Sequence, residues 1–197
     1  NAMGEGDRRA QQEAENASIL SPLTRQKVSA RFVITPRRMY HKFYNIFCNP
    51  LLWFLQHSMW SSAYTPNIDS TVHDTWATGY TPVNQAFADA IVAEAAGGPA
   101  PIVMVNDYHL YLVPGMVRKD IPDALIYHNI HIPWPSMRTW QLLPISIRNE
   151  ICASLCASDI VAFQSQWDTR SFLECCEAFV PGAHADYAQS TVTFNGH

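Results

Sequence analysis

Charged residues are few in this sequence. They make up 15% of its 197 residues, and the formal net charge is only −4. Lys and Arg form no cluster interleaved with aromatic side chains, which is the pattern of a nucleic-acid groove. No apolar run reaches the roughly 18 to 20 residues that a membrane-spanning helix needs, and the polar start has no signal-peptide core. We therefore expect a cytoplasmic protein that binds neither nucleic acid nor membrane.

Cysteine pairs and the usual cofactor motifs are also missing. The cysteines number five, and no two of them have the Cys-x-x-Cys spacing of zinc or redox sites. We interpret all of them as reduced, buried thiols: Cys48, Cys152, Cys156, Cys175 and Cys176. The sequence has no Gly-rich phosphate loop, no G-x-S-x-G motif and no set of residues at metal-ligand spacing. We expect no metal and no cofactor.

The sequence does contain, from Ala100 onward, short apolar runs that alternate with segments of helical periodicity. This alternation is typical of a parallel sheet covered by helices. The predicted buried strands are 100–107, 124–132 and 160–166. The predicted helices are one through Leu110, Val113 and Val117, then 137–142, 145–157 and 167–179, the last with a buried stripe of Phe172, Cys175, Cys176 and Phe179. The fold class is therefore α/β with a Rossmann-like parallel sheet.

The upstream part is less regular. We expect a strand at 30–34, a helix opened by Pro36, a loop at 60–75 and a helix at 82–96. Residues 1–25 form a polar segment, whose Asn1-Ala2 before Met3 resembles the remnant of a cleaved purification tag. The composition, 48% hydrophobic, is that of one globular domain, which we assign to residues 26–197.

Polar residues gather where two of the predicted strands end. Asn106, Asp107 and His109 follow the first of these strands, and His128 and His131 lie near the end of the second. Ligands of open parallel sheets bind at the carboxyl ends of the strands, so we expect these residues to face one crevice. An Asp can accept hydrogen bonds from two sugar hydroxyls, and a neutral His can donate or accept one. The alternatives are that Asp107 only caps the next helix and that the histidines belong to the core.

One long segment resembles a known family. Residues 105–135, VNDYHLYLVPGMVRKDIPDALIYHNIHIPWP, are similar to the pattern H-D-Y-H-L-x-x-x-P-x-x-[LV]-R, a strand and H-[TI]-P-[FW]-P of trehalose-6-phosphate synthases, glycosyltransferase family 20. Three more segments keep the family's order: FCNPLLWFLQH at 47–57 resembles F-x-N-x-x-L-W-x-x-x-H, YTPVNQAFA at 80–88 resembles Y-x-x-V-N-x-x-F-A, and SDIVAFQSQWDTRSFL at 158–173 resembles D-[LI]-[VI]-x-F-[QH]-T followed by F-L. The resemblance covers about residues 40–197.

The resemblance implies the N-terminal, acceptor-side half of a two-domain GT-B glycosyltransferase, incomplete at its start and without the nucleotide-binding domain. It implies retaining transfer of glucose from a nucleotide sugar, UDP- or GDP-glucose, to a sugar phosphate. By the same resemblance Asp107 holds the acceptor sugar, His131 contacts the transferred sugar near the reaction centre, and Trp76 lines the acceptor pocket. Ser58 stands at an acceptor-site position where the family has Tyr. The donor would bind mainly in the missing domain, so we expect this fragment alone to be inactive.

Other functions stay open. The segment from Trp76 to Tyr80 is one residue longer than the family's, which weakens the case for glucose 6-phosphate, as Ser58 does. HIPWPSMRTWQLLP at 131–144 is also similar to the pseudo-glycosyltransferase that couples cyclitols in validamycin biosynthesis. Glucosylglycerol-phosphate synthesis is a further alternative. A different class is a non-catalytic remnant or interaction module, in which a homo-oligomer or a partner covers the open sheet edge.

Overall fold

The centre of the molecule is a parallel sheet of three strands. The computed structural model describes residues 18–20, 27–59 and 68–197. The strands β3 (Ile102–Asn106), β4 (Leu125–Asn129) and β5 (Ile160–Ala162) lie in that order, and neighbouring strands pair in parallel. Asn106 is opposite Asn129, and Asn129 is opposite Ala162, so the three carboxyl ends lie level. This arrangement confirms the predicted α/β class and its three strands.

Helices follow each strand as predicted. They are the short η3 (Tyr108–Leu110) and α6 (Val113–Asp120) after β3, α7 (Met137–Trp140) and α8 (Ile145–Leu155) after β4, and α9 (Gln166–Phe179) after β5. The Ser165 side chain caps α9 by accepting the N–H of Asp168 at 3.2 Å. The predicted stripe of α9 is buried, and all five cysteines are buried free thiols. None of the described helices is long and apolar enough to cross a membrane.

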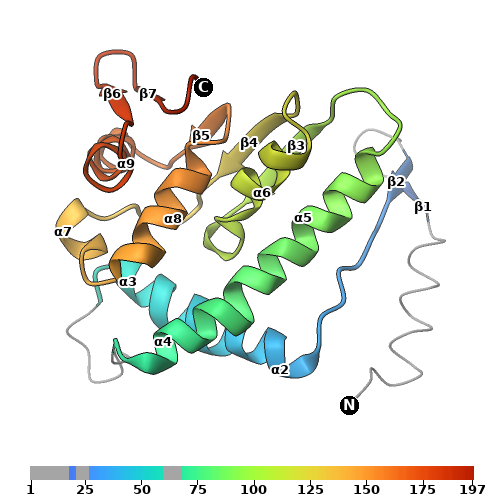
Figure 1. Ribbon diagram of the computed structural model, residues 1–197, viewed down its shortest axis with the longest axis horizontal. Coiled ribbons are helices and arrows are strands. Elements are labelled where there is room, and N and C mark those ends of the chain that lie inside the picture. The colour runs from blue at the N-terminus through green and yellow to red at the C-terminus, as the bar shows by residue number, and fades with distance from the viewer. Residues whose placement is uncertain (1–17, 21–26, 60–67) are drawn as a thin grey trace.

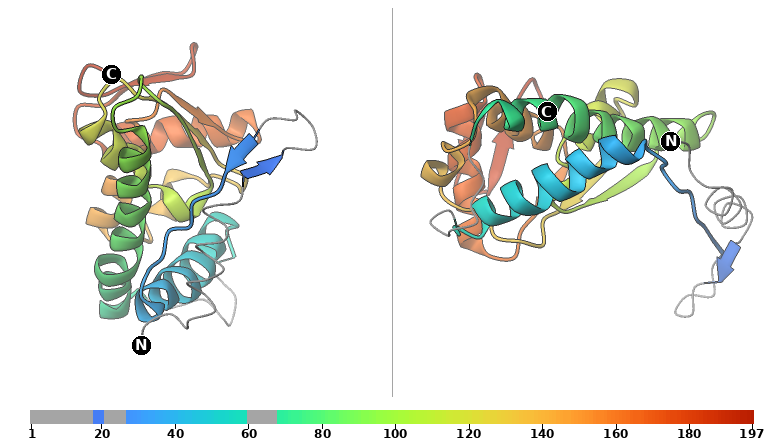
Figure 2. Two further views of the ribbon diagram at one scale, coloured as in Figure 1. Left: turned by 90° about the vertical axis from the view of Figure 1, so that its right-hand side faces the viewer. Right: turned by 90° about the horizontal axis from the view of Figure 1, so that it is seen from below.

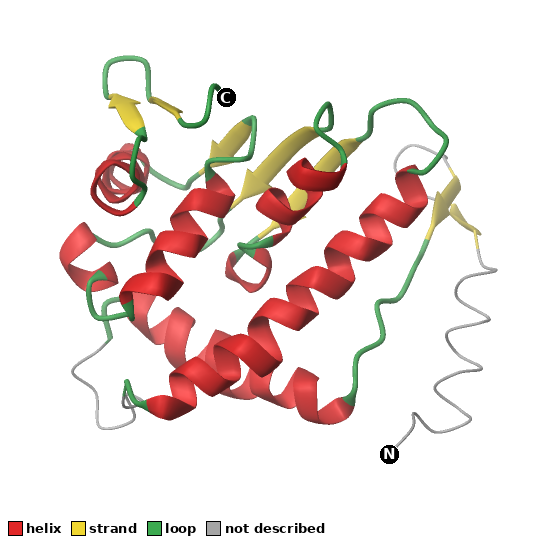
Figure 3. Ribbon diagram, in the orientation of Figure 1, coloured by secondary structure: helices red, strands yellow, loops and turns green. Residues whose placement is uncertain are grey.

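The sheet is covered on one face. Helices α5 (Thr81–Ala95), α6 and α8 lie in front of it in Figure 1, and Figure 3 shows the same layers by type. A buried cluster joins the sheet to α5 and α6: Ala88, Val103, Val105, Val113, Val117, Ala124 and Ile126. On the opposite face Ile102 is 73% exposed and Met104 is 70% exposed. The prediction of wholly buried strands is therefore wrong for that face, because burial alternates along β3.

Two long helical segments pack against each other beside the sheet. The first runs without a break through α2 (Arg37–Tyr40), η1 (His41–Trp53) and α3 (Phe54–Gln56), which confirms the helix expected after Pro36. The second runs through α4 (Ser70–Thr75), η2 (Trp76–Tyr80) and α5. The segments meet closely at Gly79, where an added Cβ would lie 2.9 Å from the backbone N of Phe43. Their buried side chains form the larger core with those of α8 and α9.

Several upstream predictions differ from the structure. Residues 30–34 are not a strand: the chain runs extended from β2 (Lys27–Ser29) to α2, apart from the sheet (Figure 2), and Arg31 Nη1 reaches Glu94 of α5 at 3.3 Å. Of the predicted loop 60–75, residues 60–67 lie outside the described residues, and Ser70 onward is helical.

Two short antiparallel pairs complete the fold. Most of the polar segment 1–25 lies outside the described residues, but its residues Ser18–Leu20 form β1, which pairs with β2. The strands β6 (His184–Asp186) and β7 (Thr191–Thr193) form a second pair that sequence patterning did not predict. Each strand is only 3 residues long, too short for a period of two to be visible.

Candidate functional site

The carboxyl edge of the sheet brings four polar residues into contact. Asn106 and Asn129 are opposite each other where β3 and β4 end. Asp107 comes directly after β3, His131 lies two residues after β4, and hydrogen bonds join all four residues. The sequence singled out three of them and missed Asn129. Asn129 could have been found from its position two residues before His131, because alternate residues of an extended chain face the same side.

Asp107 has an unusual backbone conformation. Its φ is 66° and its ψ is −179°, a region that side chains other than glycine's rarely occupy. Such a conformation costs about 1–3 kcal/mol and is found mainly at functional sites. Two hydrogen bonds hold it: the Asp107 N–H donates to the carbonyl of Asn129 at 2.8 Å, and the carbonyl of Asp107 accepts from His128 Nε2 at 3.1 Å. The fold therefore maintains a strained residue at the sheet edge.

The Asp107 carboxylate does not cap the helix that follows. Asp107 precedes η3, but its side chain makes no capping hydrogen bond there. Its Oδ1 instead accepts the backbone N–H of His131 at 3.3 Å. The alternative of a simple helix cap is therefore wrong for Asp107. A carboxylate with two oxygens, half-buried at a strand end, retains acceptor capacity for ligand hydroxyl groups.

The His131 side chain is exposed at the same edge. Its Nε2 lies 3.1 Å from Asn129 Nδ2 and 3.3 Å from Asn106 Oδ1. The ring is therefore placed by amides from both neighbouring strands. Asp107 and His131 are brought together as the sequence predicted.

The other two histidines of the predicted crevice point into the protein. His128 is fully buried, and burial lowers its pKa to about 4, so the ring is neutral at physiological pH. His109 is partly buried and stacks on Tyr44, with ring centroids 5.5 Å apart, and burial lowers its pKa as well. The expectation that His109 and His128 face the crevice is wrong. His128 instead supports Asp107 through the bond to its carbonyl.

Two residues of the second helical segment fasten the chain just after Asp107. The Tyr80 hydroxyl donates to the carbonyl of Tyr108 at 2.7 Å and accepts the N–H of Tyr111 at 3.1 Å. Asn84 Nδ2 donates to the carbonyl of His109 at 3.0 Å. Tyr80 and Asn84 are buried and four residues apart on a helix, so they act as one clamp. The sequence showed them only as part of the segment that resembles Y-x-x-V-N.

Trp76 lies in the core and takes no part in the hydrogen bonds that join Asp107, His131 and the two asparagines. It is 8% exposed, and its ring stacks on Tyr80 with centroids 5.0 Å apart. Stacking on Tyr80 covers an aromatic face that a pyranose would need. The five residues of η2 form a π-helical turn, which accommodates one residue more than an α-helical turn and matches the extra residue in this segment. Trp76 as a pocket residue stays a prediction, which this burial disfavours.

Ser58 ends the first helical segment. Its φ is 55°, its side chain is exposed, and its N–H donates to the carbonyl of Leu55 at 2.9 Å. It is thus a helix-terminating residue in the left-handed region, a position that Gly or Asn usually takes. The described residues do not bring Ser58 into contact with Asp107 or His131, and its acceptor role stays a prediction.

A hollow of about 410 Å³ adjoins the residue after Asp107. It is lined by Asn49, Pro50, Trp53, Phe54 and Tyr108. The Tyr108 hydroxyl donates to Asn49 Oδ1 at 2.7 Å, which fixes this wall. Aromatic walls with a few fixed polar groups are typical of small-molecule sites.

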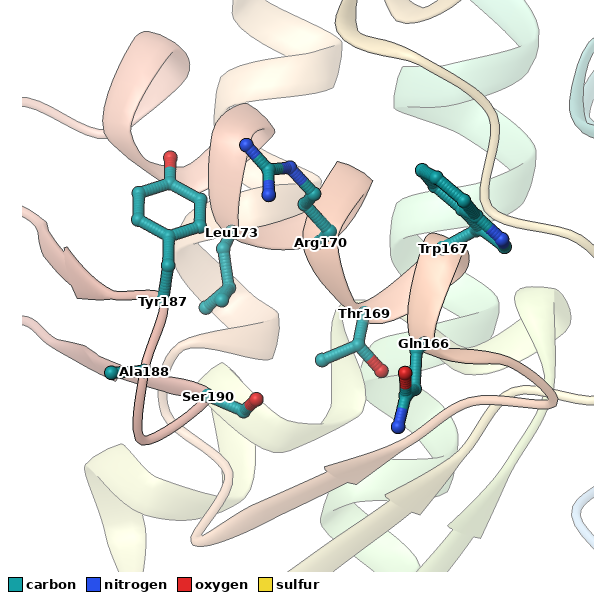
Figure 4. Close-up of a pocket in the computed structure, with 8 residues that line it drawn as sticks. All are labelled: Gln166, Trp167, Thr169, Arg170, Leu173, Tyr187, Ala188 and Ser190. Carbon is teal, nitrogen blue, oxygen red and sulfur yellow. The ribbon is translucent and has the colours of Figure 1, made fainter.

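A second hollow, of about 440 Å³, lies between the start of α9 and the turn from β6 to β7. Figure 4 shows Trp167 and Arg170 on the α9 side and Tyr187 and Ser190 on the other. Trp167 is 80% exposed. No residue that the sequence predicted for the site lines this hollow. Within the described ranges, no three His, Cys, Asp or Glu side chains converge to hold a metal ion.

Comparisons with known proteins agree on one family. The model of glycosyltransferase family 20 matches residues 5–197. The validamine 7-phosphate valienyltransferase of Streptomyces hygroscopicus subsp. jinggangensis is 29% identical over 196 residues, which are 100% of this chain and 39% of that protein. A putative alpha,alpha-trehalose-phosphate synthase [UDP-forming] 100 kDa subunit of Schizosaccharomyces pombe is 33% identical over 153 residues, 75% of this chain and 15% of that protein. The chain thus spans well under half the length of these relatives.

Solved structures show the same fold. The N-terminal domain of the Candida albicans trehalose-6-phosphate phosphatase superposes with a TM-score of 0.76 and 24% identity, over 98% of this chain and 37% of that one. An alpha,alpha-trehalose-phosphate synthase (UDP-forming) of Burkholderia vietnamiensis superposes with a TM-score of 0.67 and 26% identity, over 81% of this chain and 33% of that one. These neighbours confirm the predicted N-terminal GT-B fold, and the family match confirms the resemblance seen in the sequence. The chain belongs to glycosyltransferase family 20.

Proposed function

We propose that this chain is the acceptor-side part of a glycosyltransferase that transfers a sugar from a nucleotide sugar to a sugar phosphate. The observation that carries the proposal is the strained Asp107, whose carboxylate lies at the carboxyl edge of the sheet and is joined to His131. Strained residues of this kind cluster at active sites and ligand-binding sites. The family and the UDP-forming relatives support UDP-glucose as the donor.

In this proposal the residues bind and orient the reacting sugars. The Asp107 carboxylate accepts hydrogen bonds from hydroxyl groups of the acceptor, and His131 contacts the transferred sugar. The aromatic hollow beside Tyr108 receives the apolar side of a sugar ring. Holding two reactants in the reactive geometry accounts for a large part of such catalysis. As the family resemblance implies, the donor diphosphate assists removal of the acceptor proton, so that no protein base is needed.

A second candidate is the coupling of two cyclitols. It is favoured by the validamine 7-phosphate valienyltransferase, which matches this chain over its whole length. Ser58, at the position of the family's Tyr, and the buried Trp76 both depart from the glucose 6-phosphate pattern. The two candidates share a phosphate-bearing acceptor and differ in the ring that Asp107 holds.

Calorimetric titration of the chain separates these candidates. Glucose 6-phosphate, validamine 7-phosphate and glucose are the three ligands, and Asp107→Asn is the test variant. Loss of a charged hydrogen-bond partner costs about 1.5–3 kcal/mol, so we expect the variant to bind its phosphate ligand about tenfold more weakly or worse. Asp123→Asn, at an exposed carboxylate in the turn before β4, is the matched control and leaves the affinity unchanged.

The outcome decides between the assignments. Tighter binding of glucose 6-phosphate supports transfer to a hexose phosphate, and tighter binding of validamine 7-phosphate supports cyclitol coupling. If neither phosphate binds, or if Asp107→Asn binds as well as the unchanged chain, the acceptor-site proposal is wrong. The non-catalytic module then becomes the better account.

A further inference from the structure

The His131 ring has two amide neighbours on the same nitrogen. Nε2 lies 3.1 Å from the amide nitrogen of Asn129 and 3.3 Å from the amide oxygen of Asn106. In the part of the chain that the structure describes, no other side chain hydrogen-bonds this ring. Its Nδ1 is therefore left for a ligand.

The two amides offer opposite partners to that nitrogen. A neutral imidazole nitrogen carries either a lone pair or a hydrogen. The Asn129 NH₂ group donates to a lone pair on Nε2, and the Asn106 oxygen accepts a hydrogen from it. The Asn129 donor is the closer of the two, and a lone pair on Nε2 that accepts from it would leave the proton of the neutral ring on Nδ1. This is the reverse of the tautomer that free histidine prefers.

The amides stand on a rigid base. Asn106 and Asn129 are opposite each other in the ladder between β3 and β4, and the Asp107 N–H bonds to the carbonyl of Asn129 at 2.8 Å. The backbone of His131 is tied to the same frame, because its N–H donates to Asp107 Oδ1. Residues at paired strand ends hold an orientation more closely than residues of free loops.

We propose that Asn129 is a positioning residue, which donates to His131 Nε2 in competition with the Asn106 oxygen and so leaves an Nδ1–H donor for a ligand oxygen. That ligand oxygen belongs to a hydroxyl or phosphate group of a sugar substrate. Only this identification of the ligand rests on the proposed function. The orientation and tautomer of the ring are properties of the chain itself and can be measured without a substrate.

Nitrogen-15 NMR of the His131 ring tests the proposal, because long-range couplings distinguish the two tautomers. The spectra are taken at a pH high enough for the ring to be neutral. The unchanged chain should show mainly the Nδ1–H tautomer. Asn129→Ala removes the donor and should shift the ratio toward Nε2–H by about threefold or more, as expected for one lost hydrogen bond. Asn106→Ala removes the acceptor and should shift the ratio the opposite way.

Asn45→Ala is the matched control. Asn45 Nδ2 lies 3.0 Å from Nδ1 of His41 on η1, so this variant should change His41 and leave His131 as it was. Backbone amide spectra establish that each variant is folded. Equal His131 tautomer ratios in all variants, or shifts in the same direction for Asn129→Ala and Asn106→Ala, would overturn the proposal. A chain with the expected tautomers that binds no sugar phosphate would leave the positioning role standing and would refute the proposed function.

Discussion

Asp107 combines a costly backbone conformation with a carboxylate that, in the proposed function, holds the acceptor. Its positive φ favours glycine, but glycine has no carboxylate to offer to a ligand. We expect the free energy of unfolding of Asp107→Gly to exceed that of Asp107→Ala by about 1–2 kcal/mol. Both variants lose the carboxylate, but only Gly relieves the backbone strain. Urea denaturation measures the difference. At an ordinary position the order is reversed by about 0.5–1 kcal/mol.

Asp123 supplies the control pair for that comparison, since its φ is not positive. There Ala should be at least as stable as Gly. If Asp107→Ala proves more stable than Asp107→Gly, the backbone of Asp107 is not strained in solution. The inference from strain to function would then lose its basis.

His128 makes the stability of the chain depend on pH. Burial lowers its pKa from 6.5 to about 4 in the folded state, so the unfolded chain binds a proton more readily between these values. The neutral, buried His128 therefore costs no stability above pH 6.5. As the pH drops from 6.5 toward 4, it lowers the free energy of unfolding by about 3 kcal/mol in total. Urea midpoints at pH 7 and 4.5, compared between the unchanged chain and His128→Gln, measure it. An equal pH dependence in both proteins would contradict the buried, neutral His128.

Part of the site was predictable from residue type and position. Asp107 and His131 follow predicted strands, and parallel strands bring their carboxyl ends together. The inward direction of His109 and His128 was not predictable, because it depends on which face of the sheet the helices cover. The burial of Trp76 likewise depends on the π-helical turn of η2, and hydrophobic periodicity does not predict such a turn.

The contact between the two long helical segments depends on one glycine. A Cβ on Gly79 would lie 2.7 Å from Lys42 Cβ and 2.9 Å from the Phe43 backbone N, so the segments must separate. We expect Gly79→Ala to lower the free energy of unfolding by about 1–3 kcal/mol in urea denaturation. Gly98→Ala is the control, because its Cβ would meet only the Ala95 carbonyl at 3.5 Å. Equal stability of the two variants would mean that η1 and η2 do not approach so closely.

Elements between residues 80 and 179 were predicted well, and those before this stretch and the pair β6–β7 after it less well. The prediction of a strand at 30–34 was wrong, because β-branched and aromatic residues form a strand only where a partner edge is available. Arg31 instead holds this stretch near α5. The predicted loop 60–75 contains Asp69, which starts α4 by accepting the Thr71 N–H at 2.8 Å. Ser, Thr and Asp occur both in loops and at helix starts, so composition alone could not separate the two.

Among the described residues, no helix covers the second face of the sheet, which is the main feature at the scale of the whole molecule. Parallel sheets are normally covered on both faces, but here the side chains of Ile102, Met104, Leu125 and Ile160 are exposed.

We expect Met104→Thr to reduce self-association of the chain, measured by light scattering across a concentration series, with little change in stability. Val103→Thr, on the buried face of the same strand, is the matched variant and should destabilise the chain by about 1–3 kcal/mol. Similar effects of the two substitutions would contradict the one-sided cover.

At the same scale, the chain is a glycosyltransferase family 20 domain with polar residues at the carboxyl edge of its three-stranded sheet. The central claim is that sugar phosphates bind at this edge, at Asp107 and His131. The most direct test is an NMR titration of the chain with glucose 6-phosphate and validamine 7-phosphate, following the side-chain signals of His131, Asn129 and Trp167. We expect saturable shifts at His131 and Asn129 that disappear in Asp107→Ala. Saturable shifts confined to Trp167 and its hollow, or no saturable shift with either ligand, would contradict it.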